Sequence, residues 1–255
     1  EHCQAVAGDG AGDPLGSVRI GELPAPGMAI RRRGEDVMKG HVVLRAGHRL
    51  DAAAIGLAAT VGMACLDVAR RPRVALFSTG DELVMPGEPL PPGAIYNSNR
   101  FMLGALLRGQ GCDVTDLGNV PDRLDATRAM LREAAAGHDL ILSSGGVSVG
   151  EEDHLKPALA AEGRLDLWAI AIKPGKPLAF GAVRRAGEGE GAETWFIGLP
   201  GNPVSSHVTF TLFVRPVLAR LQGAAALLPA GLPVRADFAW PRPDKRREFL
   251  RVRRN

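Results

Sequence analysis

The chain has 255 residues, 45% of them hydrophobic, and a formal net charge of +3. This length allows one sizeable core with smaller neighbours, because single cores stop growing at roughly 250–300 residues. No apolar run reaches the about 18 residues of a membrane helix, and the three cysteines form no CxxC pair. We therefore expect no membrane span, disulfide framework or structural zinc, and a cytoplasmic location.

The positive charge is concentrated at one end of the sequence. Residues 241–255 carry seven Lys and Arg and two Asp and Glu, and the remainder has 24 basic and 26 acidic residues. One basic run is typical of a solvated face or strand edge. With a single Tyr there is also little aromatic surface for base stacking, so we expect no nucleic-acid partner.

Residues 1–71 predict a partial β-rich region followed by a linker helix. The Gly- and Asp-rich residues 1–17 predict a loop, and short apolar runs between Gly and Pro in residues 18–50 predict strands. Asp51 is the expected N-cap of a helix over residues 52–63.

From residue 72 onward, apolar strand patterns alternate with helical ones. Strands are predicted over residues 73–78, 112–118, 139–144, 165–172, 177–183 and 194–199, with a hairpin tip at 184–193, and helices over 98–111 (capped by Ser98), 124–139, 152–163 and 202–221. This alternation predicts a three-layer α/β/α domain over residues 72–222 with a mostly parallel sheet. Residues 223–255 predict a linker and the start of another β-rich domain.

Four of the predicted strands end in unusual turns. The turns are STGDEL at 78–83, SSGGVSVGEED at 143–153, KPGKP at 173–177 and LPGNP at 199–203. Ligands of open α/β sheets bind beyond the carboxyl ends of the strands, so one crevice could collect all four turns.

The turn SSGGVSVGEED is compatible with different chemistries. Ser148 stands in a GxSxG pattern, but Ser143, Ser144 and two glycines separate it from the strand, and neither His154 nor His207 has an evident orienting Asp. The glycines could expose backbone N–H groups to an anion at a helix start. They could also be required only for positive φ.

Carboxylates near this loop favour a divalent cation, because Mg²⁺ binds through one or two carboxylates together with substrate phosphates. Glu82 and Asp153 are the better candidates for that role. Glu151 and Glu152 are explained as favourable charges in the first turn of a helix.

The turns KPGKP and LPGNP add groups that suit anions. Prolines on either side of Gly175 stiffen the first turn and fix Lys173 and Lys176, although a solvated Pro-rich turn is the alternative. LPGNP predicts Asn202 as an N-cap and Pro203 as the first helical residue.

Six segments in register resemble the molybdopterin molybdenumtransferase family, which includes bacterial MoeA and the E domain of gephyrin. The segments are VALFSTGDELVMPG, IYNSNRFML, GNVPD, LSSGGVSVGEEDHLK, AIKPGKPLAFG and LPGNPVSSHVTF, and the likeness extends over about residues 18–253. It implies conversion of adenylylated molybdopterin and molybdate to molybdenum cofactor and AMP, with Mg²⁺ required. It also implies a central domain shared with the molybdopterin adenylyltransferases and an elongated homodimer.

The resemblance also implies site residues. Glu82 and Asp153 match acidic positions important for activity and would hold Mg²⁺, Asp36 matches an acidic position of the flanking domain, and Lys173, with Lys176 close by, matches a lysine that holds the anion. The expected cofactor-binding residues are Thr79, Gly80, Asp81, Asn97, Ser98, Asn99, Ser144, Gly145, Gly146, Ser148, Pro200, Gly201 and Asn202.

Two positions depart from the family pattern: Asn97 replaces the Asp of many members, and Ala169 replaces a frequent Lys. A molybdopterin-binding or scaffold module without the chemistry is therefore an alternative to the enzyme. A serine hydrolase using Ser148 is a third. Expected partners are a molybdopterin adenylyltransferase and proteins that mature molybdoenzymes.

Overall fold

The computed structural model describes residues 3–6, 16–23, 25–147, 154–187, 189 and 191–253. The chain divides into two compact units, residues 1–44 and 45–255. The predicted domain boundaries after residues 71 and 222 stay predictions.

In the described part of the first unit, β1 (Cys3–Val6) pairs antiparallel with β2 (Ser17–Ile20). The prediction of a loop over residues 1–17 is therefore wrong, because Cys3–Val6 gains its ladder from a partner that is distant in sequence. The sequence predicts strands between residues 18 and 50, and in the described part of this range the structure has only β2. Prolines and glycines interrupt the apolar runs that follow it.

The second unit has the predicted alternation of strands and helices. Its elements are α1 (Ala52–Thr60), β3 (Arg73–Thr79), β4 (Leu83–Val84), β5 (Ile95–Tyr96), α2 (Ser98–Gly109), β6 (Asp113–Val120), α3 (Leu124–Ala135), β7 (Leu140–Ser144), α4 (Leu155–Glu162), β8 (Gly163–Trp168), β9 (Ile172–Lys173), β10 (Ala179–Arg184), β11 (Glu193–Leu199), α5 (Pro203–Thr209), the π-helical turn η1 (Phe210–Val214), α6 (Arg215–Leu221) and β12 (Arg247–Glu248). Residues 223–246 run between α6 and β12 as turns and irregular chain.

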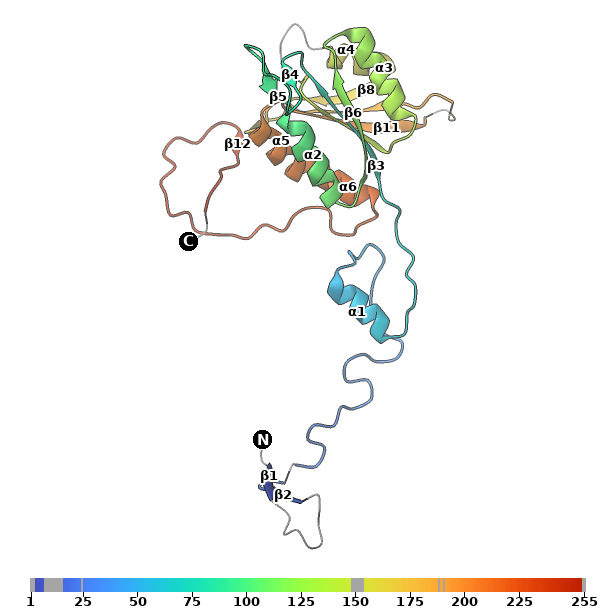
Figure 1. Ribbon diagram of the computed structural model, residues 1–255, viewed down its shortest axis with the longest axis vertical. Coiled ribbons are helices and arrows are strands. Elements are labelled where there is room, and N and C mark those ends of the chain that lie inside the picture. Colours follow the sequence, from blue (N-terminus) through green and yellow to red (C-terminus); the bar gives the residue numbers. More distant parts are fainter. Residues whose placement is uncertain are drawn as a thin grey trace. The chain divides into compact units, whose positions relative to one another are not determined.

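Six strands form the central sheet in the order β6-β3-β7-β11-β10-β8 (Figure 1). The pairs β6–β3, β3–β7 and β7–β11 are parallel, whereas β10 is antiparallel to both of its neighbours. The prediction of a mostly parallel sheet is confirmed. The predicted hairpin tip at 184–193 is the connection between β10 and β11.

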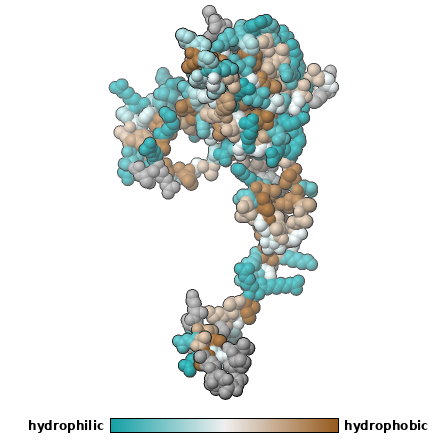
Figure 2. Space-filling model, in the orientation of Figure 1, coloured by the Kyte–Doolittle hydropathy of each residue, from teal (hydrophilic) through white to brown (hydrophobic). Residues whose placement is uncertain are grey.

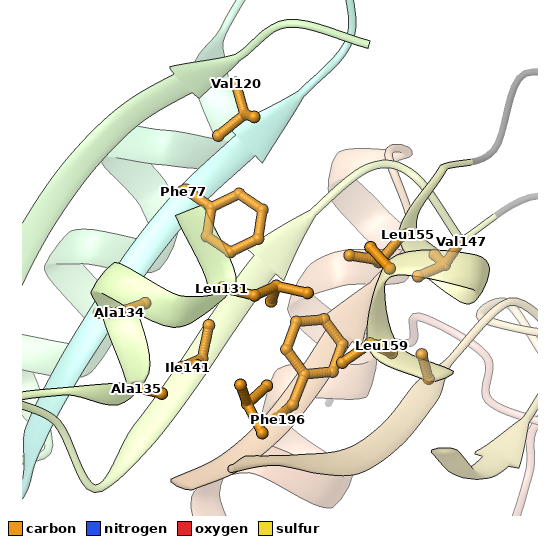
Figure 3. Packing of buried hydrophobic residues seen from close by; sticks show 14 residues of the cluster. Phe77, Val120, Leu131, Ala134, Ala135, Ile141, Val147, Leu155, Leu159 and Phe196 are labelled. Carbon is orange, nitrogen blue, oxygen red and sulfur yellow. The ribbon is translucent and has the colours of Figure 1, made fainter. Parts of the chain in front are cut away.

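Helices cover both faces of the sheet, because successive side chains of a strand point to opposite faces. In β3, Val74 and Leu76 belong to a cluster with residues of α2, η1 and α6, whereas Ala75 and Phe77 belong to a cluster with α3 and α4. Figure 3 shows the second cluster, where the ring of Phe196 lies close to Leu131. The three-layer α/β/α arrangement is thereby confirmed.

Short polar side chains fix the starts of three helices. Asp51 caps α1 and Asn202 caps α5, both as predicted. The cap of α2 is Asn97 and not Ser98, because Ser98 is already the first helical residue and Asn97 Oδ1 accepts a hydrogen bond from the Arg100 amide at 3.2 Å.

The long helix predicted over residues 202–221 is interrupted in its middle. Here η1 lies between α5 and α6 and ends two residues before Pro216. Proline has no N–H, and its ring would collide with the carbonyl four residues earlier in a regular α-helix. A widened turn accommodates that ring.

Exposed apolar side chains gather around α1. Ile55 is 57% exposed and Val68 is 68% exposed, and Figure 2 shows brown, hydrophobic surface over this segment. Among the described residues, no helix has the length and apolar character to cross a membrane.

Candidate functional site

The four unusual turns leave the same edge of the central sheet. The row of paired residues Phe77, Ser143, Gly198, Ala179 and Trp168 crosses β3, β7, β11, β10 and β8 just before that edge. The carboxyl ends of β3, β7, β11 and β8 therefore point the same way. We call this the carboxyl edge, and the opposite one the amino edge.

The turn after β3 is held by the end of β6 and the residues that follow it. Asn119 Nδ2 donates to the carbonyl oxygen of Gly80 at 3.0 Å, and the Asp122 amide donates to Asp81 Oδ1 at 3.3 Å. The carboxylate of Glu82 folds back over Gly80, where a Cβ would lie 2.5 Å from Glu82 Oε2. The backbone of this turn is thus fixed, and the Glu82 side chain is exposed.

Sequence reasoning did not select Asn119 and Asp122 as site residues. Both stand in GNVPD, at the end of a strand parallel to β3, and this position was the signal that could have identified them. They bring a carboxylate and an amide to the edge that carries Asp81 and Glu82.

The glycine loop after β7 begins in a tightly packed conformation. Gly145 and Gly146 have φ of +91° and +65°, and a Cβ at either position would lie within 2.7 Å of Thr79 oxygen atoms. The Gly145 amide donates to the Leu199 carbonyl at 3.1 Å, so it is not available to an anion. Backbone conformation and packing therefore explain both glycines.

Four residues in this loop and its surroundings are candidates for its chemistry. Ser148 and Asp153 lie outside the described residues. His207 is exposed on α5 and His154 is half-buried next to α4. Neither the serine hydrolase hypothesis nor a metal site at Asp153 is tested by the described residues.

The start of α2 places two asparagines over the strand ends. Asn97 Oδ1 accepts from the Arg100 amide and from Ser78 Oγ at 3.4 Å, whereas Asn99 Nδ2 donates to Ser144 Oγ and to the Gly201 carbonyl, both at 2.8 Å. The intervening Ser98 is exposed. Asn97 and Asn99 thus lie at the edge, and the side chain of Ser98 is in solvent.

Several polar atoms at this edge are buried without a partner. Among the described residues, no hydrogen-bond partner reaches Thr79 Oγ1, Asn97 Nδ2, Asn99 Oδ1 or Ser143 Oγ. Buried polar groups in folded proteins are normally paired, so a cluster of unpaired ones indicates a place that a ligand completes.

Within the turn KPGKP the two lysines have different surroundings. Lys173 Nζ lies 3.1 Å from Glu248 Oε1 and 3.4 Å from Asp244 Oδ2, and β9 pairs with β12 in parallel. Hydrogen bonds to Glu248 and Asp244 raise the pKa of Lys173. An anion at Lys173 would have to displace two carboxylates.

Lys176 is exposed and forms no ion pair in the described parts of the chain. Its carbonyl accepts from the Ile170 amide at 2.9 Å, and Ala169 donates to Leu178 at 2.8 Å, which closes the turn. Ala169 has a φ of +73°, a left-handed conformation that is uncommon for a residue with a Cβ.

The LPGNP turn mainly positions α5. Asn202 Oδ1 accepts from the amides of Val204 and Ser205, and Ser206 Oγ donates to the Pro200 carbonyl. Gly201 of this turn also accepts the hydrogen bond from Asn99 Nδ2.

Asp36 and the carboxylates near Gly80 belong to different units of the chain. Asp36 belongs to the first unit, where Arg31 donates to it at 2.7 Å and both side chains are exposed. In the described residues no group of three or more His, Cys, Asp or Glu side chains could hold a metal ion. Glu82 and Asp81 supply the hard oxygen donors that Mg²⁺ prefers, and a site with one or two carboxylates is sufficient when substrate phosphates complete it.

Known proteins are similar to this chain in both sequence and fold. The family described as "Probable molybdopterin binding domain" matches residues 75–220, and "MoeA N-terminal region (domain I and II)" matches residues 1–62. Molybdopterin molybdenumtransferase of Haemophilus influenzae is 47% identical over 208 residues, covering 82% of this chain and 50% of that protein. Molybdopterin molybdenumtransferase 2 of Mycobacterium tuberculosis is 40% identical over 213 residues, covering 81% and 51%.

A solved structure agrees with these relatives. The molybdopterin biosynthesis MoeA protein from Pyrococcus horikosii has a TM-score of 0.65 and 30% identity, with 88% of this chain and 52% of that one covered. The chain spans about half the length of the relatives it matches.

Proposed function

Because the chain belongs to the molybdopterin binding domain family, we propose that it acts in molybdenum cofactor biosynthesis as a molybdopterin molybdenumtransferase. In that reaction molybdate is inserted into adenylylated molybdopterin and AMP is released. The observation that carries the proposal is the set of buried, unpaired polar atoms at the carboxyl edge, on Thr79, Asn97, Asn99 and Ser143. They supply neutral hydrogen-bonding capacity of the kind that a large polar substrate requires.

Among the residues that the structure describes, Glu82 is the one best suited to hold Mg²⁺. Asp153, which lies outside them, would be the second ligand. The Glu82 carboxylate is exposed beside Gly80 and forms no ion pair in the described residues. When bound, Mg²⁺ would neutralise charge on the pyrophosphate oxygens of the substrate. Asp81 and Asp122, joined by a hydrogen bond, keep the Glu82 turn in place.

Lys176 is the cation proposed to offset negative charge on the substrate. It lies on the turn that follows β8 at the carboxyl edge and is not neutralised by a described carboxylate. A preorganised cation stabilises charge that develops in a transition state. Lys173 contributes only if Asp244 and Glu248 release it.

Other parts of the proposal come from the resemblance. Asp36 would act from the first unit, and the whole protein would be a cytoplasmic homodimer that receives its substrate from a molybdopterin adenylyltransferase. The neutralised Lys173 favours a second candidate, a molybdopterin-binding module that lacks the chemistry.

The direct test is AMP release from adenylylated molybdopterin and molybdate, with and without Mg²⁺. Glu82→Gln and Asp153→Asn should abolish AMP release while the fold is kept, as judged by circular dichroism. Asp113→Asn, an exposed carboxylate at the amino edge, should leave the rate unchanged. Full activity of Asp153→Asn would refute the assignment, and molybdopterin binding without AMP release by the wild type would favour the binding module.

A further inference from the structure

The amides of Asn97 and Asn99 have only one possible orientation each. Asn97 Oδ1 accepts from the backbone N–H of Arg100, which only an oxygen can satisfy. Asn99 Nδ2 donates to the carbonyl of Gly201, which only an N–H can satisfy. The groups left over are therefore a fixed donor, Asn97 Nδ2, and a fixed acceptor, Asn99 Oδ1.

Both leftover groups are buried. Asn97 is 2% exposed and Asn99 is 7% exposed, and neither group has a partner in the described part of the chain. Water reaches neither side chain to any extent, so the structure carries a destabilising cost at both positions. Serine would cap α2 as well as Asn97 does and would leave no amide N–H group unpaired.

The two groups lie over neighbouring strand ends. Asn97 contacts Ser78 at the end of β3, and Asn99 contacts Ser144 at the end of β7. Ser78 and Ser144 are paired across these strands, which run about 4.8 Å apart. One fused ring system is wide enough to extend across two strand ends at this spacing.

We propose that Asn97 and Asn99 together recognise one edge of a planar heterocycle that presents a hydrogen-bond acceptor to Asn97 Nδ2 and a donor to Asn99 Oδ1. This inference rests on the proposed function, because the substrate carries two such rings. The lactam edge of the pterin and the amidine edge of the adenine both combine an acceptor with a donor. The absence of a charged side chain among the four unpaired groups agrees with a neutral ligand edge.

The test measures binding and does not depend on turnover. The full chain is titrated with 6-hydroxymethylpterin and, separately, with AMP, at pH 8 by calorimetry. Asn97→Ser keeps a capping oxygen and removes the donor, and Asn97→Asp keeps the cap and the shape but replaces the donor by a second acceptor. Asp51→Ser makes a comparable change at the cap of α1, away from the edge.

Both Asn97 variants should bind one of the two ligands about tenfold more weakly, the loss expected for one buried hydrogen bond. The ligand affected identifies the ring, and Asp51→Ser should bind as the wild type does. Circular dichroism checks that the variants fold, and the near-isosteric Asn97→Asp serves if Asn97→Ser does not. Unchanged affinity of the folded Asn97 variants for both ligands would overturn the inference and leave the proposed function standing. A wild-type chain that binds neither ligand would overturn both.

Discussion

The two edges of the central sheet differ in whether all of their buried polar groups are paired. At the amino edge Asp139 is 8% exposed and accepts from both terminal nitrogens of Arg70, at 2.6 and 2.7 Å, and from the Arg73 amide at 2.8 Å. The hydroxyl of Thr194, fully buried, is paired with the His138 carbonyl at 2.9 Å. Every one of these groups has its partner within the chain.

At the carboxyl edge, four groups of similar burial have no partner among the described residues. They belong to Thr79, Asn97, Asn99 and Ser143. Burial alone therefore does not distinguish structural polar residues from ligand-binding ones; the satisfaction of their hydrogen bonds does. The paired groups of the amino edge stabilise the fold, whereas the four groups at the carboxyl edge keep unused hydrogen-bonding capacity.

Loss of the carboxylate at the amino edge should have the largest effect. Asp139→Ala removes charged hydrogen bonds to Arg70 and Arg73, so the free energy of unfolding should fall by about 2–3 kcal/mol, measured by urea denaturation. Asp113→Asn breaks an exposed pair 3.9 Å from Arg71 and should cost less than about 0.5 kcal/mol. Equal losses in the two variants would contradict the structural role of the amino edge.

Acid should weaken the same edge. The hydrogen bond from Arg70 lowers the pKa of Asp139 from 3.8 to about 2. Since the folded pKa is the lower one, this stabilisation is complete above about pH 4 and is lost as the pH falls toward 2, by about 2 kcal/mol. Urea titrations at pH 5 and pH 2.5 should show this component in the wild type and not in Asp139→Asn; identical acid losses would assign it to other carboxylates.

A matched pair of threonines compares the edges directly. Thr194→Val at the amino edge leaves the His138 carbonyl without this donor and should cost about 1 kcal/mol of unfolding free energy. Thr79→Val at the carboxyl edge removes an unpaired hydroxyl and should cost less than about 0.5 kcal/mol, or stabilise the fold. Thermal denaturation of both variants measures the difference, and a larger loss for Thr79→Val would reverse the comparison.

Lys173 differs from the four unpaired groups at the carboxyl edge, since its charge is already paired with carboxylates. The double variant Asp244→Asn, Glu248→Gln should free it and strengthen AMP binding by about threefold, a gain in the range of one partly exposed ion pair. Asp237→Asn, at an exposed carboxylate of the same terminal segment, controls for the removal of one negative charge, half of the change made by the double variant. Adding Lys173→Gln should remove the gain; a gain that persists without Lys173 would exclude release of this lysine as its cause.

The sequence predicts β3 and β7 well because these two strands are continuous, mostly apolar runs. Residues 73–78 and 139–144 agree with β3 and β7 to within one residue, and parallel strands bring their turns to one edge by geometry alone. The cap of α2 was misassigned because Asn97 and Ser98 are both good caps. The choice between them depends on how α2 packs against Ser78.

Other features are invisible in local sequence patterns. The Lys173–Glu248 pair joins residues far apart in the chain, and no periodic pattern in the sequence predicts it. The strand Cys3–Val6 depends in the same way on its partner β2. The state of Asn97 and Asn99 is also non-local, because unpaired groups are recognised only when all of their neighbours are known.

The hydrogen bonds of Asn99 have a dynamic consequence. One amide nitrogen joins the start of α2 to Ser144 at the end of β7 and to Gly201 before α5, so segments about a hundred residues apart share one anchor. A ligand that donates a hydrogen bond to Oδ1 of the same amide would restrain all three segments at once. Hydrogen exchange at the backbone amides near residues 99, 144 and 201 should then slow together, which makes this single side chain an internal reporter of occupancy.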